Sequence, residues 1–393
     1  MQLKPNGARP TMSQRPPVDM LPASIGGADV RRLLTLARLF GGAAFLTTAF
    51  ACAHQVQPTF EISPVSALPC RQLASPADAS IWIVPSGRKA SEPLARWCGT
   101  VGPVLFQSQP AAEERSAINR LGIVSWNIHE GSGDVEELMR RLRLGEFTDG
   151  EPVDQFVLLL QEATRVDASV PQRLPRGAPS PHRIAPSSGR PDGDVHRLAD
   201  QGLAVLYAPS MRNGEADGTA EDRGNAIVST VPLQRPRLIE LPLQHQRRVA
   251  VMAAVAGRNS RGTPWRVDLI DVHLDTTLAL WHGGPWTARR RQATALVAAL
   301  RALPPSSPEP SATVLAGDLN SWLGADDGAV SVLRESFNGA VDVDRQPTWI
   351  GPLGLRATLD HIFIRGAATP VRATRLSSRF GSDHYPLLLM LDF

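Results

Sequence analysis

Two apolar runs toward the C-terminus of this chain are bordered by polar, chemically active side chains. Residues 313–316 (Thr-Val-Leu-Ala) lead directly into Gly317-Asp318-Leu319-Asn320, and Asp383-His384 stands just before the apolar run at 387–391. Because alternate residues of a β-strand share a face, Asp318 and Asn320 are expected at the same edge of a sheet. A chain with this pattern is expected to fold around buried strands whose ends form a site.

Short apolar runs of the same kind recur from residue 121 onward. We expect strands at 121–126, 156–160, 203–208, 225–231, 248–256, 265–273, 312–317, 359–364 and 387–392, and one earlier at 81–84. One helix is expected from Asp134, with Glu137 three residues on, to Gly145. A second carries an apolar stripe at Ala293, Leu296, Val297, Leu300 and Leu303. Since several consecutive strands are separated only by turns, the pattern favours an α/β fold with mixed sheets.

The chain is expected to have three parts. In residues 1–52, arginines precede the apolar run 39–46 and Ala49-Phe50-Ala51, which is typical of a secretory signal peptide, with an amphipathic helix as the alternative. Cys52 would carry a lipid if this were a lipoprotein signal, but Phe50 disfavours that, so simple export to the periplasm or the outside is preferred. Residues 53–117 are expected to form a short Pro-containing appendage and residues 118–393 one large domain, with a long surface loop at 165–195.

Charge and cysteine content limit the function and the compartment. Residues 1–52 have a net charge of +4 and the remainder of the chain −1. Proteins that bind long nucleic acids usually carry a basic excess, so the net charge of −1 weighs against a dedicated duplex-binding protein. With Cys52 removed or lipidated, Cys70 and Cys98 could form one disulfide in an oxidising compartment, or remain as two buried thiols.

Polar side chains recur where the expected strands stop. They are Asn127 and His129, Glu162, the alternating Asp271, His273 and Asp275, the pair Asp318 and Asn320, Asp360, and Asp383 with His384. Open α/β folds bind ligands at strand ends. Carboxylates with Asn and His, and without Cys, suit a hard cation such as Mg²⁺ or Mn²⁺. The set therefore predicts a metal-assisted site, although Asp318 and Asn320 alone would be equally compatible with an Asx turn.

In their order along the chain, these segments resemble the endonuclease/exonuclease/phosphatase superfamily. The resemblance is carried by Ser125-Trp126-Asn127-Ile128, Leu160-Gln161-Glu162, Asp222-Arg223-Gly224-Asn225, Asp271-Val272-His273, Gly317-Asp318-Leu319-Asn320, Leu359-Asp360-His361-Ile362-Phe363 and Ser382-Asp383-His384-Tyr385-Pro386. It spans about residues 121–393. It implies a four-layer sandwich of two mixed β-sheets flanked by helices, with residues 118–393 as the catalytic domain.

The resemblance also implies a role for each site residue. Glu162 would hold the catalytic divalent ion, assisted by Asn127 and by Asp383. Asp318 would orient and deprotonate the attacking water, and Asn320 would position the phosphate. His384 would face the scissile phosphate with its tautomer set by Asp360, and His273 resembles a second catalytic histidine. The residues expected to contact substrate are Arg223, Asn225 and Trp281.

The expected activity is metal-dependent hydrolysis of a phosphoester or phosphodiester by an activated water. A phosphodiester is an anion that repels hydroxide, so hydrolysis benefits from a cation and a positioned water. A secreted nuclease and a phospholipid-directed, sphingomyelinase-like phosphodiesterase both fit, and a non-catalytic surface binding protein with the same fold is the alternative from another class. We expect a phosphate-ester substrate, no obligate protein partner and a monomer. Trp281 and Trp286 could stack on a base, rest at a membrane interface, cover a sugar ring or simply pack their loop.

Overall fold

The computed structural model describes residues 60–63, 70, 81–85, 91–108, 117–174, 177–179, 194–213, 220–276, 284–304, 308, 310–338, 341 and 346–393. The chain divides into two units, Met1–Val56 and Gln57–Phe393, and all described residues belong to the second. The signal segment expected at 1–52, with Cys52, lies outside the described residues, so export stays a prediction. None of the described helices is long and apolar enough to cross a membrane.

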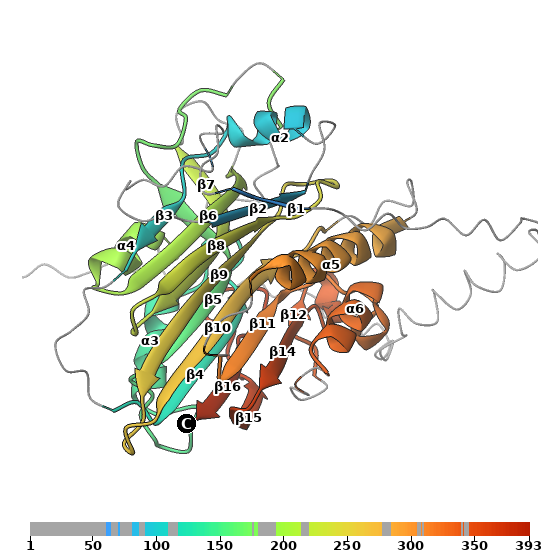
Figure 1. Ribbon diagram of the computed structural model, residues 1–393. Coiled ribbons are helices and arrows are strands. Elements are labelled where there is room, and N and C mark those ends of the chain that lie inside the picture. Colours follow the sequence, from blue (N-terminus) through green and yellow to red (C-terminus); the bar gives the residue numbers. More distant parts are fainter. Residues whose placement is uncertain are drawn as a thin grey trace, which may run out of the picture. The chain divides into compact units, whose positions relative to one another are not determined.

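The first of two large sheets has seven strands in the order β1-β2-β8-β9-β10-β11-β14 (Figure 1). Strands β10 and β11 run parallel, as do β2 and β8, and the other neighbours are antiparallel. The sheet is therefore mixed, as expected. Its strands are β1 (Phe60–Ser63), β2 (Ile81–Pro85), β8 (Gln234–Glu240), β9 (Val249–Arg258), β10 (Pro264–His273), β11 (Ala312–Asp318) and β14 (Asp360–Gly366).

The second sheet also has seven strands, in the order β15-β16-β4-β5-β7-β6-β3. Only β4 and β5 are parallel. Its strands are β3 (Leu105–Gln107), β4 (Arg120–Asn127), β5 (Phe156–Val166), β6 (Ala204–Arg212), β7 (Glu221–Ser229), β15 (Thr369–Arg375) and β16 (Leu387–Asp392). A separate two-stranded ribbon is made by β12 (Trp349–Ile350) and β13 (Arg356–Ala357), with the 3₁₀ turn η4 (Pro352–Gly354) between them.

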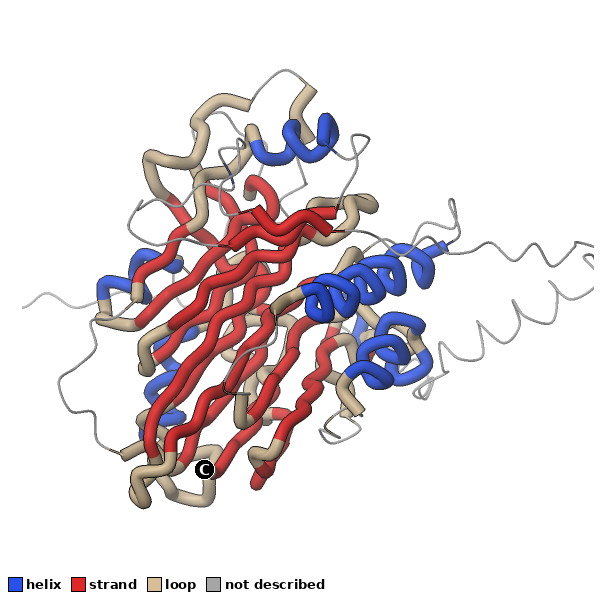
Figure 2. The backbone as a smooth tube through the Cα atoms, viewed as in Figure 1, coloured by secondary structure: helices blue, strands red, loops and turns tan. Residues whose placement is uncertain are grey.

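Helices cover the outer faces of both sheets (Figure 2). Because alternate residues face opposite sides of a strand, Ile123 of β4 packs in the core between the sheets, whereas Val124 packs in the core beneath the helices. The helices on the second sheet are α3 (Val135–Arg143) and α4 (Val195–Asp200), and those on the first are α5 (Gly284–Ala302) and α6 (Gly328–Ser336), the latter preceded by the 3₁₀ turn η3 (Gly324–Asp326). The predicted four-layer α/β sandwich is confirmed.

The ends of α3 follow from local sequence. Asp134 caps the helix by accepting a hydrogen bond from the Glu137 backbone N–H at 2.9 Å, as its spacing predicted. Gly145 follows the helix with φ 71°, and a Cβ there would lie 2.6 Å from the Gly150 carbonyl carbon. Glycine is therefore required at this turn.

The expected strands are present, and the structure adds two long ones that the sequence pattern did not predict. Strand β8 contains Arg235, Pro236 and Arg237, and β15 contains Pro370, Arg372 and Arg375, so neither reads as an apolar run. Both ends of the surface loop expected at 165–195 belong to regular elements, because β5 continues to Val166 and α4 begins at Val195.

The segment 53–117, expected as an appendage, supplies strands to both sheets. β2 pairs with β8 in the first sheet and β3 pairs with β6 in the second. Helix α2 (Ser91–Cys98) lies between them in sequence, and its last residue, Cys98, forms a disulfide with Cys70. Of the two alternatives for these cysteines, the structure has the disulfide.

Candidate functional site

Three neighbouring strands of the first sheet bring three of the expected site residues side by side. In the strand register, His273 at the end of β10 is the partner of Asp318 at the end of β11, and Asp318 is the partner of Asp360 at the start of β14. All three are buried, with 2–3% of their surface exposed. Register alone therefore places two carboxylates and an imidazole in one row.

The second sheet contributes Asn127 and Glu162 from its parallel pair, β4 and β5. The pairing of β5 with β7 shifts register between Leu160 and Ala163, and Glu162 within this bulge has φ 59°. Bulges re-aim side chains, and a non-glycine residue at positive φ is often found at functional sites. The Glu162 carboxylate accepts a hydrogen bond from the Glu130 backbone N–H at 2.9 Å, which fixes its direction.

Asn127 connects the two sheets at the site. Its amide Nδ2 donates to Asp318 Oδ2 at 3.0 Å and lies 3.5 Å from Glu162 Oε1. Its Oδ1 accepts from the His129 backbone N–H at 2.9 Å. The residues of the expected metal-binding half and of the expected water-activating half therefore meet through one side chain.

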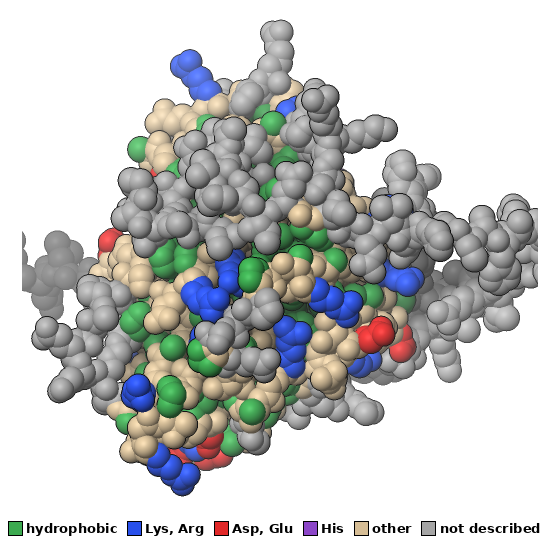
Figure 3. All heavy atoms as spheres, viewed as in Figure 1, with side chains coloured by type: hydrophobic (Ala, Val, Ile, Leu, Met, Phe, Trp, Pro, Cys, Tyr) green, Lys and Arg blue, Asp and Glu red, His purple; other side chains and the backbone are tan. Residues whose placement is uncertain are grey.

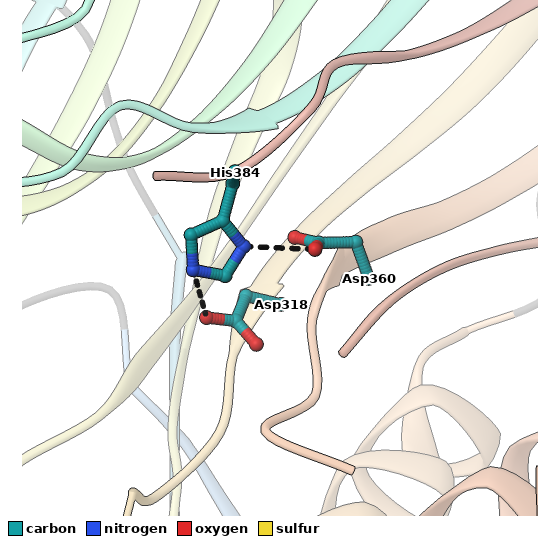
Figure 4. Close-up of side chains that lie close together, drawn as sticks. All are labelled: Asp318, Asp360 and His384. Carbon is teal, nitrogen blue, oxygen red and sulfur yellow. Dashed lines mark hydrogen bonds and ion pairs between the residues drawn. The ribbon is translucent and has the colours of Figure 1, made fainter. Parts of the chain in front are cut away.

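His384 lies between two carboxylates, as Figure 4 shows. Its Nδ1 is 2.8 Å from Asp360 Oδ2, and its Nε2 is 3.8 Å from Asp318 Oδ2. The backbone around it is held by the Ser382 hydroxyl, which donates to the Asn127 carbonyl and accepts from the His384 N–H. Because Nδ1 binds Asp360, the Nε2 edge of the ring is directed toward Asp318.

Burial and neighbouring charge perturb both partners of this pair. Burial alone would lower the pKa of His384, but the carboxylates of Asp360, Asp318 and Asp383 outweigh it and raise the pKa to about 10. Burial raises the pKa of Asp318 to about 7, with the charge of His384 opposing the shift and that of Asp360 adding to it. The Asp318 carboxylate is thus poised near neutral pH, in the range suited to general acid–base chemistry.

Asn320 and His273 border Asp318 on its other sides. The Asn320 backbone N–H donates to Asp318 Oδ1 at 2.8 Å, and its side-chain amide donates to the Leu274 carbonyl at 3.1 Å. Asn320 has φ 49°, so its backbone is bent sharply directly after the strand. His273 Nε2 is 3.5 Å from Asp318 Oδ2, and burial, followed by the charge of Arg248, lowers the pKa of His273 well below its usual range.

The remaining expected residues lie less directly at this centre. Asp383 accepts from the Trp349 indole N–H at 2.8 Å and lies 3.2 Å from His129 Nδ1. Arg223 forms an ion pair with Glu130, and the Glu130 backbone N–H donates to Glu162. Arg223 therefore contacts the site indirectly, through Glu130. The Asn225 side chain donates to the Val249 carbonyl at 3.3 Å.

Trp281, also expected to contact substrate, lies outside the described residues. Its expected role stays a prediction, as do those of Arg223 and Asn225.

The donor set fits a hard divalent cation. Glu162, Asp318 and Asp383 offer carboxylate oxygens, with no thiol among them. The Asn127 amide directs its Nδ2 to Asp318 and Glu162 and its Oδ1 to the His129 N–H, so its oxygen becomes a ligand only if the amide turns over. Burial raises the pKa of Asp318 to about 7, and a cation beside it would favour the ionised carboxylate. Ligand atoms of Asp318, Asp360 and His384 also lie within 4.8 Å of one another, a spacing that could hold an ion. Since Asp360 and His384 already bind each other, the Glu162 side is the better assignment.

Sequence reasoning missed several residues that shape the site. Arg248 donates to His273 Nδ1 at 3.1 Å, and Trp349 binds Asp383. Arg248 is the first residue of the strand expected at 248–256 and stands directly before the observed β9, and a charged side chain at that strand end was the available signal. Asp271, by contrast, was among the polar strand-end residues expected from the sequence; it accepts from Gln161 at 2.6 Å, and burial raises the pKa of its carboxyl well above its usual range.

A family model described as the Endonuclease/Exonuclease/phosphatase family matches residues 124–384. The chain therefore belongs to the Endonuclease/Exonuclease/phosphatase family, whose members are phosphoester hydrolases. No curated protein matches the chain in sequence.

Solved structures of the family are similar to this chain. One, an endonuclease/exonuclease/phosphatase from Beutenbergia cavernae, is 19% identical over 70% of this chain and 72% of its own length, with a TM-score of 0.46. The human Nocturnin catalytic domain with bound sulfate is 18% identical over 71% and 96% of the two chains, with a TM-score of 0.45. A family protein from Leptotrichia buccalis is 12% identical over 70% and 100%, with a TM-score of 0.46. Similarity at this level does not identify a substrate.

Proposed function

We propose that this protein is an exported, divalent-metal-dependent hydrolase that cleaves phosphoester or phosphodiester bonds. The observation that carries the proposal is the hydrogen-bonded row Asp360–His384 facing Asp318, with the Asn127–Glu162 pair at the same strand ends. A carboxylate-backed imidazole beside a buried carboxylate supplies the two proton-handling groups that hydrolysis needs. Oxygen ligands next to them supply a place for the cation.

The two halves of the row have different tasks in the proposed reaction. Asp318 orients a water and accepts its proton as the water oxygen bonds to phosphorus and the bond from phosphorus to the ester oxygen breaks; the leaving oxygen takes up a proton from solvent. His384, kept protonated by Asp360, donates from Nε2 to the phosphate and stabilises negative charge that builds up there. Asn320 holds Asp318 through its backbone N–H, which keeps the base from rotating away from the water.

The cation would be Mg²⁺ or Mn²⁺, bound by Glu162 with Asn127 and Asp383. When bound, it neutralises charge on the phosphate oxygens. The chain's own part is to supply fixed ligands: the bulge of β5 and the Glu130 N–H direct Glu162, and the Trp349 indole directs Asp383.

The substrate is proposed only as a phosphate ester, with nucleic acid, phospholipid and small phosphoesters all in the class. On the face that Figure 3 shows, the Arg side chains of the described residues lie in separate groups rather than in one continuous band. Together with the net charge of −1 outside residues 1–52, this gives no preference for a duplex nucleic acid. We propose a monomer without an obligate protein partner.

Export is supported by two independent observations. The N-terminal segment 1–52 has the arginine flank, short apolar run and small residues of a secretory signal. The Cys70–Cys98 disulfide is of a kind that persists in oxidising compartments. Lipid attachment at Cys52 is the variant of this proposal that mass spectrometry of the mature N-terminus would detect.

A substrate screen tests the proposal. The full-length protein is incubated with plasmid DNA, RNA, sphingomyelin, inositol phosphates and bis(p-nitrophenyl) phosphate, each with Mg²⁺, Mn²⁺ or EDTA. We expect turnover of at least one substrate that EDTA abolishes and that Asp318→Asn and His384→Ala each lower by at least about 10²-fold. Stoichiometric binding of a phosphate ester without turnover under any metal would instead identify a non-catalytic binding protein.

A further inference from the structure

The two histidines of the site have opposite kinds of partner behind their rings. His384 Nδ1 faces the carboxylate of Asp360, whereas His273 Nδ1 faces the guanidinium of Arg248 at 3.1 Å. A carboxylate accepts a hydrogen bond from a protonated ring nitrogen in front of it. A guanidinium can only donate, because arginine carries no acceptor and does not lose its proton in proteins.

The proton of neutral His273 is therefore located by its partner. Since Nδ1 accepts from Arg248, the ring carries its single proton on Nε2. This Nε2 is buried and has no hydrogen-bond partner among the described residues, and Asp318 Oδ2 is 3.5 Å away. A buried N–H without a partner is costly, so this atom points to a ligand oxygen that belongs beside Asp318.

Arg248 itself is placed for this task rather than for a structural ion pair. It is 5% exposed, its Nη2 donates to the Gln246 side chain at 2.9 Å, and its Nε has no hydrogen-bond partner in the described part of the chain. Its neighbour Arg247 makes the contrast, because that guanidinium donates two hydrogen bonds of 2.9 Å to the Glu240 carboxylate and one to the Pro209 carbonyl. Arg247 therefore stabilises the fold, whereas the Arg248 guanidinium contacts a side chain of the site.

We propose that Arg248 is a positioning residue that holds His273 as a neutral imidazole with its proton on Nε2. His273 then serves as a fixed hydrogen-bond donor to a phosphate oxygen or to the attacking water. The site thereby keeps a directed N–H donor next to Asp318. The role of His273 rests on the proposed function, but its tautomer does not.

Nuclear magnetic resonance tests the tautomer without turnover. In uniformly ¹⁵N-labelled full-length protein, with His273 assigned by comparison with His273→Ala, we expect its Nδ1 at the shift of an unprotonated nitrogen and its Nε2 at that of a protonated one. Arg248→Met, which keeps the length but not the charge, should remove this preference. Arg248→Lys, which keeps a cationic donor, should largely retain it, and the matched control Arg247→Met should leave it unchanged. A wild-type ring protonated on Nδ1, or on both nitrogens at pH 7, overturns the inference.

Kinetics test the consequence once a substrate is in hand. Arg248→Met should lower kcat by about 10²-fold with KM nearly unchanged, since a preorganised donor acts mainly in the transition state. In a His273→Ala background the same change should cost little more, because the two residues act as one unit. Full additivity of the two losses would overturn the positioning role. If no substrate is ever turned over, the proposed function fails while the spectroscopic result still decides the tautomer.

Discussion

Replacing Asp360 by asparagine removes the negative charge behind His384 but keeps an oxygen that can accept from Nδ1. The site distance of 2.8 Å between His384 Nδ1 and Asp360 Oδ2 is that of a charge-assisted hydrogen bond. His384 has a pKa of about 10, raised from 6.5 mainly by three carboxylates, of which Asp360 contributes most. We therefore expect Asp360→Asn to lower the pKa of His384 by about 1–2 units.

The size of the stability change follows from linkage. One pKa unit corresponds to about 1.4 kcal/mol, so the variant should lose about 2 kcal/mol of unfolding free energy. A group whose pKa is raised on folding stabilises the protein fully below its unfolded pKa and loses this contribution as the pH rises through its folded pKa. The difference between wild type and Asp360→Asn should thus be near its full value at pH 6–7 and vanish toward pH 10.

Two measurements on metal-free protein check this expectation. Urea unfolding of wild type and variant between pH 6 and pH 10.5 gives the stability difference, and the His384 ring resonances give its pKa directly. Turnover should fall by about 10²–10⁴-fold, the range seen when a carboxylate behind a catalytic imidazole is neutralised. An unchanged pKa of His384, or a stability difference that stays constant to pH 10.5, would refute the reasoning.

Three further outcomes are expected. Because burial raises the pKa of Asp318 to about 7, its ionisation should destabilise the metal-free protein as the pH rises through 7. Asp318→Asn should therefore raise the melting temperature in EDTA at pH 8 while abolishing turnover. A lowered melting temperature would contradict this. Millimolar Mg²⁺ should raise the wild-type melting temperature but do so far less for Glu162→Gln than for the control Glu146→Gln, with equal shifts counting against Glu162 as a ligand. Replacing Cys70 and Cys98 by serine should cost about 3.6 kcal/mol of unfolding free energy, given their separation of 28 residues, and urea unfolding without any loss would show that the disulfide constrains little.

Much of the fold could be predicted because its signal is local. Buried strands such as 121–126 and 312–317 read as apolar runs wherever they lie in the molecule, and the Asp134 cap of α3 needs only residues three apart. Strand β8 was not predicted because Arg235 and Pro236 in its first half interrupt the apolar pattern, although it pairs with both β2 and β9 and buries Leu238 and Ile239.

The site residues could be located, but their partnerships could not. Asp318, Asp360 and His384 were each expected from their positions at strand ends, and the structure brings them together. Asn127 and Asp318 are 191 positions apart in the chain, yet the Asn127 Nδ2 lies 3.0 Å from Asp318 Oδ2. This contact could not be predicted from the sequence, since it depends on how the two sheets stack. Arg248 and Trp349 were missed for the same reason, because each acts across strands.

The amino-acid pattern by itself determined most of the buried strands and the polar residue types that stand beside them. Periodicity and strand-end polarity are properties of neighbouring residues, so they survive without a structure. Only the tertiary structure decided that Asp360 lies behind one histidine and Arg248 behind the other, because the register of β10, β11 and β14 and the approach of the second sheet are set by packing across the whole core. That choice of partners, rather than the residue types, distinguishes the two histidines.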